Sequence, residues 1–167
     1  GLGDVYKRQV YSQRVTQTIN DGWKFSLFEG DASTADFDIS GWTDVSIPHT
    51  WNAKDADDEI PGYFRGKGWY RKVVAVEELI PEQRVYLSFE GANQETNVFV
   101  NGTFVGNHKG GYSAFTFDVT DYVHAGRNLI AVSVDNSHNP DIAPLSADFT
   151  FFGGIYRDCL LYTSPSP

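Results

Sequence analysis

The feature that most constrains the fold is a succession of short runs in which apolar residues alternate with polar ones, separated by residues typical of turns. Alternation with a period of two places every second side chain on one face of an extended strand, so each run indicates a half-buried β-strand. The runs occupy residues 23–28, 45–47, 69–76, 84–89, 97–100, 103–105, 114–119 and 128–134. Strands that recur every ~8–12 residues are typical of a β-sandwich or β-barrel.

One tight turn between two of these runs is specified by the sequence itself. Asn101-Gly102 separates run 97–100 from run 103–105, and an Asn-Gly pair readily takes the positive φ angles that a two-residue hairpin needs. Helical signals are few, because no segment repeats apolar residues at three- and four-residue spacing over several turns. Residues 77–79 and 121–124 are expected to form short turns. We therefore predict an all-β domain of about eight or more strands, mostly antiparallel.

Composition excludes several classes of protein. Of the 167 residues, 41% are hydrophobic and 15% are aromatic, which is enough for a packed core rather than a disordered chain. The formal net charge of −9 repels phosphate backbones and argues against a nucleic-acid partner. No stretch approaches the ~18 consecutive apolar residues of a membrane-spanning helix. A single cysteine excludes an internal disulfide and a multi-cysteine metal site.

The two ends of the chain differ from the rest. The chain has no methionine, and residues 1–9 (GLGDVYKRQ) lack the apolar stretch of a signal peptide. Residues 1–9 and 159–167 (CLLYTSPSP) resemble translated sequencing-adaptor sequence, so we interpret both as non-native ends and residues 10–158 as the domain. The alternative is that residues 160–162 finish a genuine strand. The localisation stays open in either case, with cytoplasmic, periplasmic and extracellular sites not distinguished.

Two long loops, 48–68 and 136–154, carry the side chains best suited to binding a ligand. Sugars present apolar C–H faces to aromatic rings and hydroxyls to carboxylate, amide and guanidinium groups. The candidate rings are Trp51, Tyr63, Phe64, Trp69 and Tyr112. The candidate hydrogen-bonding groups are Asp55, Arg65, Asn136, His138 and Asp148. For each ring the competing interpretation is packing in the core, and residues 57–59 are interpreted as a solvated acidic loop.

Motifs of several enzyme classes are missing. There is no G-x-S-x-G, P-loop, H-E-x-x-H or G-x-G-x-x-G pattern, and the glycines of residues 62–68 are not at phosphate-loop spacing. The four histidines are widely separated along the chain, which argues against a metal site built from them. These are His49, His108, His124 and His138.

Seven motifs in a fixed order nevertheless carry a family resemblance. They are DGWKF (21–25), IPHTWN (47–52), GKGWYR (66–71), FEG (89–91), VFVNGTFVG (98–106), NLIAV (128–132) and FGGIYRD (152–158). In this order and spacing, they make residues 21–158 resemble the N-terminal sugar-binding domain of glycoside hydrolase family 2, the family of β-galactosidases and β-glucuronidases.

The resemblance implies a jelly-roll β-sandwich that is one part of a larger enzyme. In the family, this domain accompanies an immunoglobulin-like domain and a catalytic (β/α)₈ barrel, and terminal β-linked sugars are hydrolysed with retention. That mechanism needs two carboxyl groups ~5–5.5 Å apart. In the family both are glutamates of the barrel, and neither motif is present here, so this chain is expected to have no catalytic residue of its own. β-Galactosides are the favoured substrates of the parent enzyme.

The resemblance also implies roles for individual residues. Asp148 matches a family aspartate that reaches the terminal sugar and in some members contacts a sodium ion; the alternative is an aspartate that caps a nearby turn. The parent enzyme is thus expected to use no organic cofactor, with a sodium or magnesium ion as its only candidate ions. Asp55 and Arg65 lie where other members supply a second sugar contact, and Arg157 and Asp158 are expected to tie the last strand to the core.

Two other hypotheses for the function of this domain stay open. A jelly roll can be a free-standing carbohydrate-binding module without a hydrolase partner, since a fold alone does not decide function. It can also be a structural fragment whose apolar face is meant for the barrel. The candidate residues for that face are Phe149, Phe151, Phe152 and Ile155.

Overall fold

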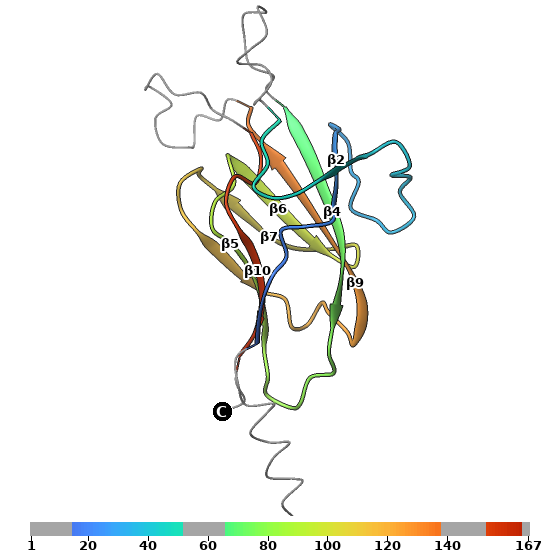
Figure 1. Ribbon diagram of the computed structural model, residues 1–167, viewed down its shortest axis with the longest axis vertical. Helices are drawn as coiled ribbons and strands as arrows, with labels where there is room; N and C mark the ends of the chain where they lie inside the picture. The colour runs from blue at the N-terminus through green and yellow to red at the C-terminus, as the bar shows by residue number, and fades with distance from the viewer. Residues whose placement is uncertain (1–14, 52–65, 138–152, 165–167) are drawn as a thin grey trace, which may run out of the picture.

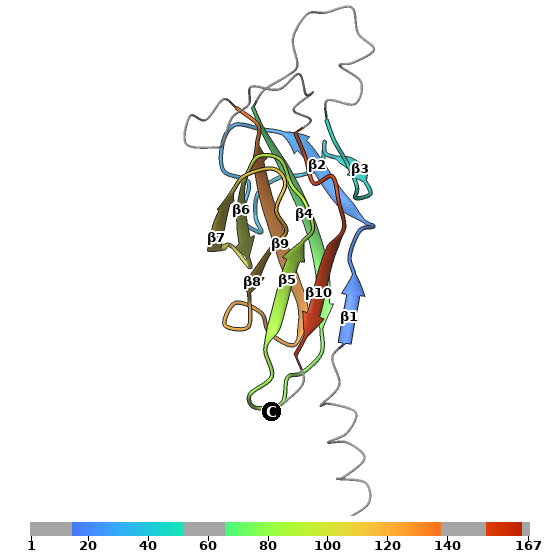
Figure 2. The same ribbon diagram turned by 90° about the vertical axis from the view of Figure 1, so that its left-hand side faces the viewer.

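The computed structural model describes residues 15–51, 66–137 and 153–164, in which ten β-strands form two facing sheets (Figures 1 and 2). All strand pairs within the sheets are antiparallel. The predicted all-β sandwich is therefore confirmed.

The smaller sheet has four strands in the order β1-β10-β5-β8. Its strands are β1 (Val15–Thr18), β5 (Val85–Phe89), β8 (Phe115–Asp118) and β10 (Cys159–Thr163). Strand β10 comes last in the sequence, yet it lies between β1 and β5; it pairs with β5 along its whole length and with β1 from Leu160 to Thr163. The beginning and the end of the described chain are thus joined in one sheet.

The larger sheet has six strands in the order β3-β2-β4-β9-β6-β7. Its strands are β2 (Trp23–Leu27), β3 (Thr43–Val45), β4 (Lys67–Val76), β6 (Glu95–Val100), β7 (Thr103–Lys109) and β9 (Gly126–Asp135). The two central strands, β4 and β9, are the longest and pair from Lys67↔Asp135 to Val76↔Gly126. They are the centre of the six-stranded sheet, and their Lys67↔Asp135 pair brings the end of the first long loop beside the start of the second.

The hairpin between β6 and β7 has the predicted turn. Asn101 has a φ of 51° and Gly102 a φ of 82°, so both turn residues take the left-handed conformation that a type I′ turn requires. The neighbouring residues Val100 and Thr103 are paired across the turn.

The core lies between the two sheets and follows the alternation seen in the sequence. In β5, buried positions alternate strictly with half-buried ones. The facing sheet contributes Trp23 and Tyr70, which are fully buried and meet edge to face with ring centroids 6.4 Å apart. Nε1 of Trp23 donates to the carbonyl of Ile19 at 2.6 Å, so this buried polar atom is satisfied. Burying such side chains contributes ~1.5–3 kcal/mol each, which makes this layer the main source of stability.

The segment between β2 and β3 covers part of the outer face of the six-stranded sheet. Nε1 of Trp69 donates to the carbonyl of Gly30 at 3.0 Å, and Nη1 of Arg71 donates to the carbonyl of Thr34 at 2.8 Å. Trp69 is only 1% exposed as a result. Its ring packs in a cluster with Ala32 and Ala131, which agrees with the competing interpretation of packing rather than sugar binding.

The described residues contain no helix, and the two expected turns have different outcomes. Residues 121–124 turn as expected, because the amides of Tyr122 and Val123 both donate to the carbonyl of Val119. Residues 77–79 are irregular, and the turn follows at residues 81–82. In the part of the chain described, no helix is long and apolar enough to cross a membrane.

Strand β10 lies within residues 159–167, which the sequence analysis interpreted as a non-native end. Cys159 is fully buried and Leu161 is 5% exposed, so both pack in the core. Burial raises the pKa of the Cys159 thiol and keeps it neutral. This agrees with the alternative in which residues 160–162 finish a genuine strand. Residues 1–14 and 165–167 lie outside the described residues, so the origin of the ends and the boundaries 1–9 and 10–158 stay predictions.

Candidate functional site

Both long loops begin and end at the same end of the sandwich, which we call the loop end. The amide of Trp51, at the start of the first loop, donates to the carbonyl of Gly153, at the end of the second, at 3.1 Å. Gly66 and Asn136 make the reciprocal connection: the Asn136 amide donates to the Gly66 carbonyl at 3.0 Å, and the Gly66 amide donates to Oδ1 of Asn136 at 2.8 Å. The four described loop ends therefore form two hydrogen-bonded pairs.

Most sequence-predicted site residues lie outside the described residues, so their roles stay predictions. This group comprises Asp55, Tyr63, Phe64, Arg65, His138 and Asp148. Of the residues proposed for an apolar docking face, Phe149, Phe151 and Phe152 are also outside. Ile155 is described and is fully buried in the core, so it is not part of an exposed face.

Trp51 is a described member of the predicted binding set and lies at the loop end, where its amide is hydrogen-bonded to Gly153. Its ring stacks on Phe25 with centroids 5.8 Å apart and planes at 18°. On its other sides it packs against Gly68 and Gly153, where an added Cβ would lie 2.7 Å and 2.0 Å from ring atoms. Trp51 thus anchors the entry and exit of the loops by packing, and its contact with a sugar stays a prediction.

The half-buried His49 and the fully buried Tyr70 form a polar pair near the start of the first loop. Nδ1 of His49 and the hydroxyl of Tyr70 are 2.6 Å apart, and the His49 amide donates to the carbonyl of Ile155 at 2.8 Å. Burial lowers the pKa of His49 and raises that of Tyr70. Both side chains are consequently neutral near pH 7, and they fix the backbone that leads into the first loop.

Asn93 is a loop-end residue that the sequence analysis did not select. Its backbone pairs with Gly154 in both directions, with N···O distances of 2.9 Å and 3.1 Å. Its side chain lies beside Gly111, where an added Cβ would be 2.5 Å from Oδ1 of Asn93. The amide is half-buried and carries the hydrogen-bonding groups that suit a sugar hydroxyl. The sequence gives no signal for this position, and only the pairing with Gly154 in the structure places Asn93 at the loop end.

Tyr112 stands at the rim of the loop end. Its side chain is 81% exposed, the largest exposure among the large hydrophobic residues described. The preceding residue, Gly111, accepts a hydrogen bond from the hydroxyl of Tyr156, which holds this turn in place. The guanidinium of Arg157 lies 5.8 Å from the centroid of the Tyr156 ring. Tyr112 is thus an exposed ring on a fixed backbone.

The binding candidate Asn136 and the predicted structural residue Asp158 both stabilise the fold. Asn136 is fully buried and holds Gly66, so its side chain is not available to a ligand. Asp158 accepts a hydrogen bond from Nδ2 of Asn20 at 2.9 Å, and its carbonyl accepts from the amide of Glu90. Asp158 therefore ties the start of β10 to the rest of the fold, as expected.

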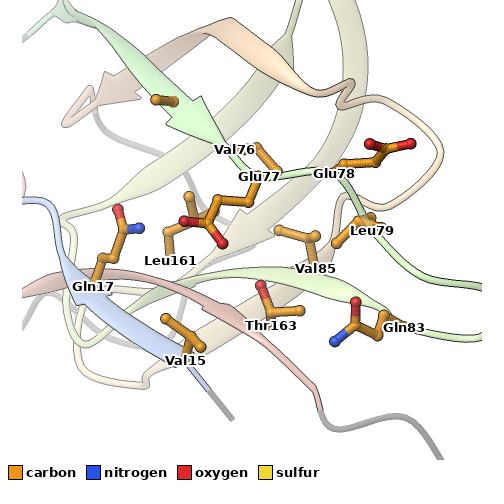
Figure 3. Close-up of a pocket in the computed structure, with 11 residues that line it drawn as sticks. Val15, Gln17, Val76, Glu77, Glu78, Leu79, Gln83, Val85, Leu161 and Thr163 are labelled. Atoms are coloured by element: carbon orange, nitrogen blue, oxygen red, sulfur yellow. The ribbon is translucent and has the colours of Figure 1, made fainter. Parts of the chain in front are cut away.

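A pocket of about 120 Å³ lies at the opposite end of the sandwich (Figure 3). It is lined by residues of β1, β4, β5 and β10 and of the connection between β4 and β5. Its ionisable residues are Glu77 and Glu78, and it contains none of the sequence-predicted residues. Within residues 15–51, 66–137 and 153–164, no group of three or more His, Cys, Asp or Glu side chains is arranged to hold a metal ion.

Comparisons with known proteins agree with the fold and the motif order. The family model described as glycosyl hydrolases family 2, sugar binding domain, matches residues 16–165. A β-glucuronidase of Bacteroides fragilis is 37% identical over 158 residues, which cover 92% of this chain and 21% of that protein. A β-galactosidase of Thermoanaerobacter pseudethanolicus is 40% identical over 168 aligned positions, covering 95% of this chain and 20% of that protein.

A solved structure shows the same similarity in three dimensions. The crystal structure of a β-glucuronidase from Bacteroides uniformis superposes with a TM-score of 0.84 at 45% identity, covering 92% of this chain and 18% of that one. This chain thus spans about a fifth of the length of the enzymes that it matches. By the extent of the family match, the chain belongs to glycoside hydrolase family 2, as its N-terminal sugar-binding domain.

Proposed function

We propose that this chain is the sugar-holding part of a retaining β-glycosidase, whose two long loops grip the terminal β-linked sugar of the substrate beside a catalytic barrel. The observation that carries the proposal is the pairing of Trp51 with Gly153 and of Gly66 with Asn136. These hydrogen bonds attach both loops to one end of a rigid sandwich, which is how binding loops are usually supported.

The proposed sugar contacts come from both loops. Asp148, in the loop that ends at Gly153, accepts hydrogen bonds from sugar hydroxyls. Asp55, Arg65 and His138 supply further polar contacts, and the ring of Trp51 supplies an apolar one. Such charge-assisted hydrogen bonds contribute ~1.5–3 kcal/mol each, and they accelerate hydrolysis only if they strengthen in the transition state.

Chemistry is divided between this domain and the rest of the parent enzyme. The acid and the nucleophile of a retaining glycosidase are carboxyl groups ~5–5.5 Å apart on rigid supports. We place them on a (β/α)₈ barrel of the parent, with an immunoglobulin-like domain as a second neighbour. In this division, the domain described here positions the sugar, and the barrel cleaves the bond.

For the substrate we propose β-glucuronides first and β-galactosides second. The motifs of the sequence favour β-galactosides, but β-glucuronidase is the more frequent name among the similar proteins. The sugar-specific contacts are expected mainly in the barrel, so both substrates belong in the test.

The test is Asp148→Asn in the full-length parent enzyme, assayed on a β-glucuronide and a β-galactoside. We expect kcat/KM on the preferred substrate to fall about tenfold, which corresponds to ~1.4 kcal/mol of transition-state binding. Asp121→Asn is the matched control, because Asp121 is exposed in the turn after β8 at the opposite end of the sandwich. A value of kcat/KM within about twofold of the wild type would show that Asp148 does not hold the sugar.

A further inference from the structure

Two buried polar side chains, Gln94 and Thr96, and the half-buried ring of His108 lie between the two sheets near the loop end. Gln94 is 1% exposed and Thr96 is fully buried. His108 stacks its ring on Phe115, with centroids 4.1 Å apart and planes at 12°. The next inward-facing residue of β6, Val98, is an apolar residue of the core. Buried polar groups in such surroundings almost always have hydrogen-bond partners.

The backbone pairing brings these three side chains together. Thr96 and His108 are directly opposite each other in the β6–β7 ladder. The amide of Gly110 donates to the carbonyl of Gln94 at 3.0 Å, so Gln94 lies at the next position toward the loop end. Positions two residues apart on one strand face are separated by ~7 Å. The three side chains therefore share one small region between the sheets.

Four polar atoms of this cluster have no hydrogen-bond partner among the described residues. They are Nε2 and Oε1 of Gln94, Oγ1 of Thr96 and Nδ1 of His108. Leaving a buried donor or acceptor unpaired costs an appreciable part of the net stability of a domain, and here four such atoms occur together. A common partner that both donates and accepts would satisfy them.

We propose that Gln94, Thr96 and His108 form a buried hydration site that binds ordered water between the two sheets. A buried water molecule typically makes about three hydrogen bonds to polar groups that are otherwise unsatisfied. The Gln94 amide offers a donor and an acceptor, and the Thr96 hydroxyl offers either. Burial lowers the pKa of His108, so its ring is neutral near pH 7 and one ring nitrogen can accept from water.

The position of this site gives it a supporting role. Gln94 directly follows Asn93, whose backbone pairs with Gly154 at the loop end. Water that holds the Gln94 side chain also holds the start of β6, and with it the backbone on which the second loop closes. The hydration site does not depend on which sugar, if any, the loops bind.

Thr96→Val in the full chain distinguishes a hydrated site from a dry one, because valine has nearly the shape of threonine without its hydroxyl. With water bound, the variant loses one hydrogen bond, and we expect the unfolding equilibrium constant in urea to rise about fivefold. At a dry site the variant removes an unpaired buried hydroxyl, so an unchanged or smaller constant would overturn the proposal. The effect is measured relative to Thr103→Val, since Thr103 is exposed on the adjacent strand β7.

A high-resolution crystal structure of the same chain tests the proposal without any variant. We expect an ordered water within about 3.2 Å of both Oγ1 of Thr96 and an amide atom of Gln94. A protein group in that place, or no density, would contradict the hydration site. A titration that detects no sugar binding would contradict the proposed function but would leave the hydration site unaffected. The two proposals can therefore be tested independently.

Discussion

At the scale of single residues, the Asn101 side chain connects three parts of the fold. Its Nδ2 donates to the carbonyl of Tyr122 and to Oδ1 of Asn128, both at 2.9 Å. Its Oδ1 accepts from the amide of Leu129 at 2.9 Å. The residue that shapes the β6–β7 turn therefore also holds the start of β9 and the turn after β8.

Two substitutions separate these roles of Asn101. Asn101→Gly keeps the positive φ but removes the side-chain bonds, and we expect the free energy of unfolding to fall by ~1–3 kcal/mol. Asn101→Ala loses the same bonds and adds the cost of a left-handed alanine, a further ~1–2 kcal/mol. Urea denaturation measures both. Stability of Asn101→Gly equal to that of the wild type would show that the hydrogen bonds contribute nothing.

The burial of His49 and His108 leads us to expect a free energy of unfolding that depends on pH. Burial lowers the pKa of His49 and of His108 in the folded chain. The unfolded chain therefore takes up protons first as the pH falls through the ordinary histidine value of ~6.5, and stability is lost from there down to the lower folded pKa. We expect the free energy of unfolding to be smaller at about pH 5.5 than at about pH 7.5.

His49→Gln should weaken this pH dependence, because one of the two contributing groups is removed. The comparison uses urea denaturation at both pH values. His124→Gln is the control, since the side chain of His124 is exposed. If His49→Gln and the wild type lose the same free energy on acidification, His49 is not a source of the effect.

At the scale of elements, alternation predicted the strands that have one buried face. Strand β5 shows it plainly, with Leu87 and Phe89 buried and their neighbours half-buried. Strand β1 was missed because all four of its residues are exposed at the edge of the sheet, so it has no apolar pattern. The cover on the outer sheet face was missed too, because Trp69 and Arg71 make their contacts with carbonyls 37–39 residues away.

Strand β10 is expected to be essential, which tests the interpretation of residues 159–167 as a non-native end. A chain that stops after Asp158 loses the strand between β1 and β5, and it also loses the partner of β1. We expect it to show no cooperative unfolding transition. The milder variant Leu161→Ala should lose ~2–5 kcal/mol, because it leaves a cavity in the core.

A chain that stops after Ser164 is the matched control for this truncation. It keeps β10 and should unfold at the same urea concentration as the full chain. If the chain that stops after Asp158 also unfolds at that concentration, residues 159–163 contribute nothing to stability, and the adaptor interpretation gains support.

At the scale of the whole molecule, the candidate site was predictable in composition but not in arrangement. The two loops stood out by their length and by their mixture of rings and charged groups. That Trp51 meets Gly153, about a hundred positions further along the chain, follows only from the closure of the sandwich. Asn93 was missed for the same reason, since its neighbours Gly111 and Gly154 are brought to it by different strands.

Activity and binding assays on the isolated chain distinguish an accessory domain of an enzyme from a free-standing binding module. As an accessory domain it should release no product from a β-glucuronide or a β-galactoside, because in the proposed division of roles the acid and the nucleophile belong to the rest of the parent enzyme. Its affinity for either sugar should be weaker than millimolar in isothermal titration or ligand-observed NMR. Association costs ~4–15 kcal/mol before any contact is counted, and the loops of this chain would form only one wall of the site.

A complete binding groove would give a different result in the same titration. A Kd between millimolar and micromolar, reduced tenfold or more by Tyr112→Ala, would identify a self-contained module whose exposed ring stacks on the sugar. Phe104→Ala is the control, since Phe104 is also an exposed large hydrophobic residue and lies beside the β6–β7 turn. Binding that both variants weaken equally would indicate a general loss of structure, and binding that neither variant weakens would place the sugar away from the Tyr112 rim.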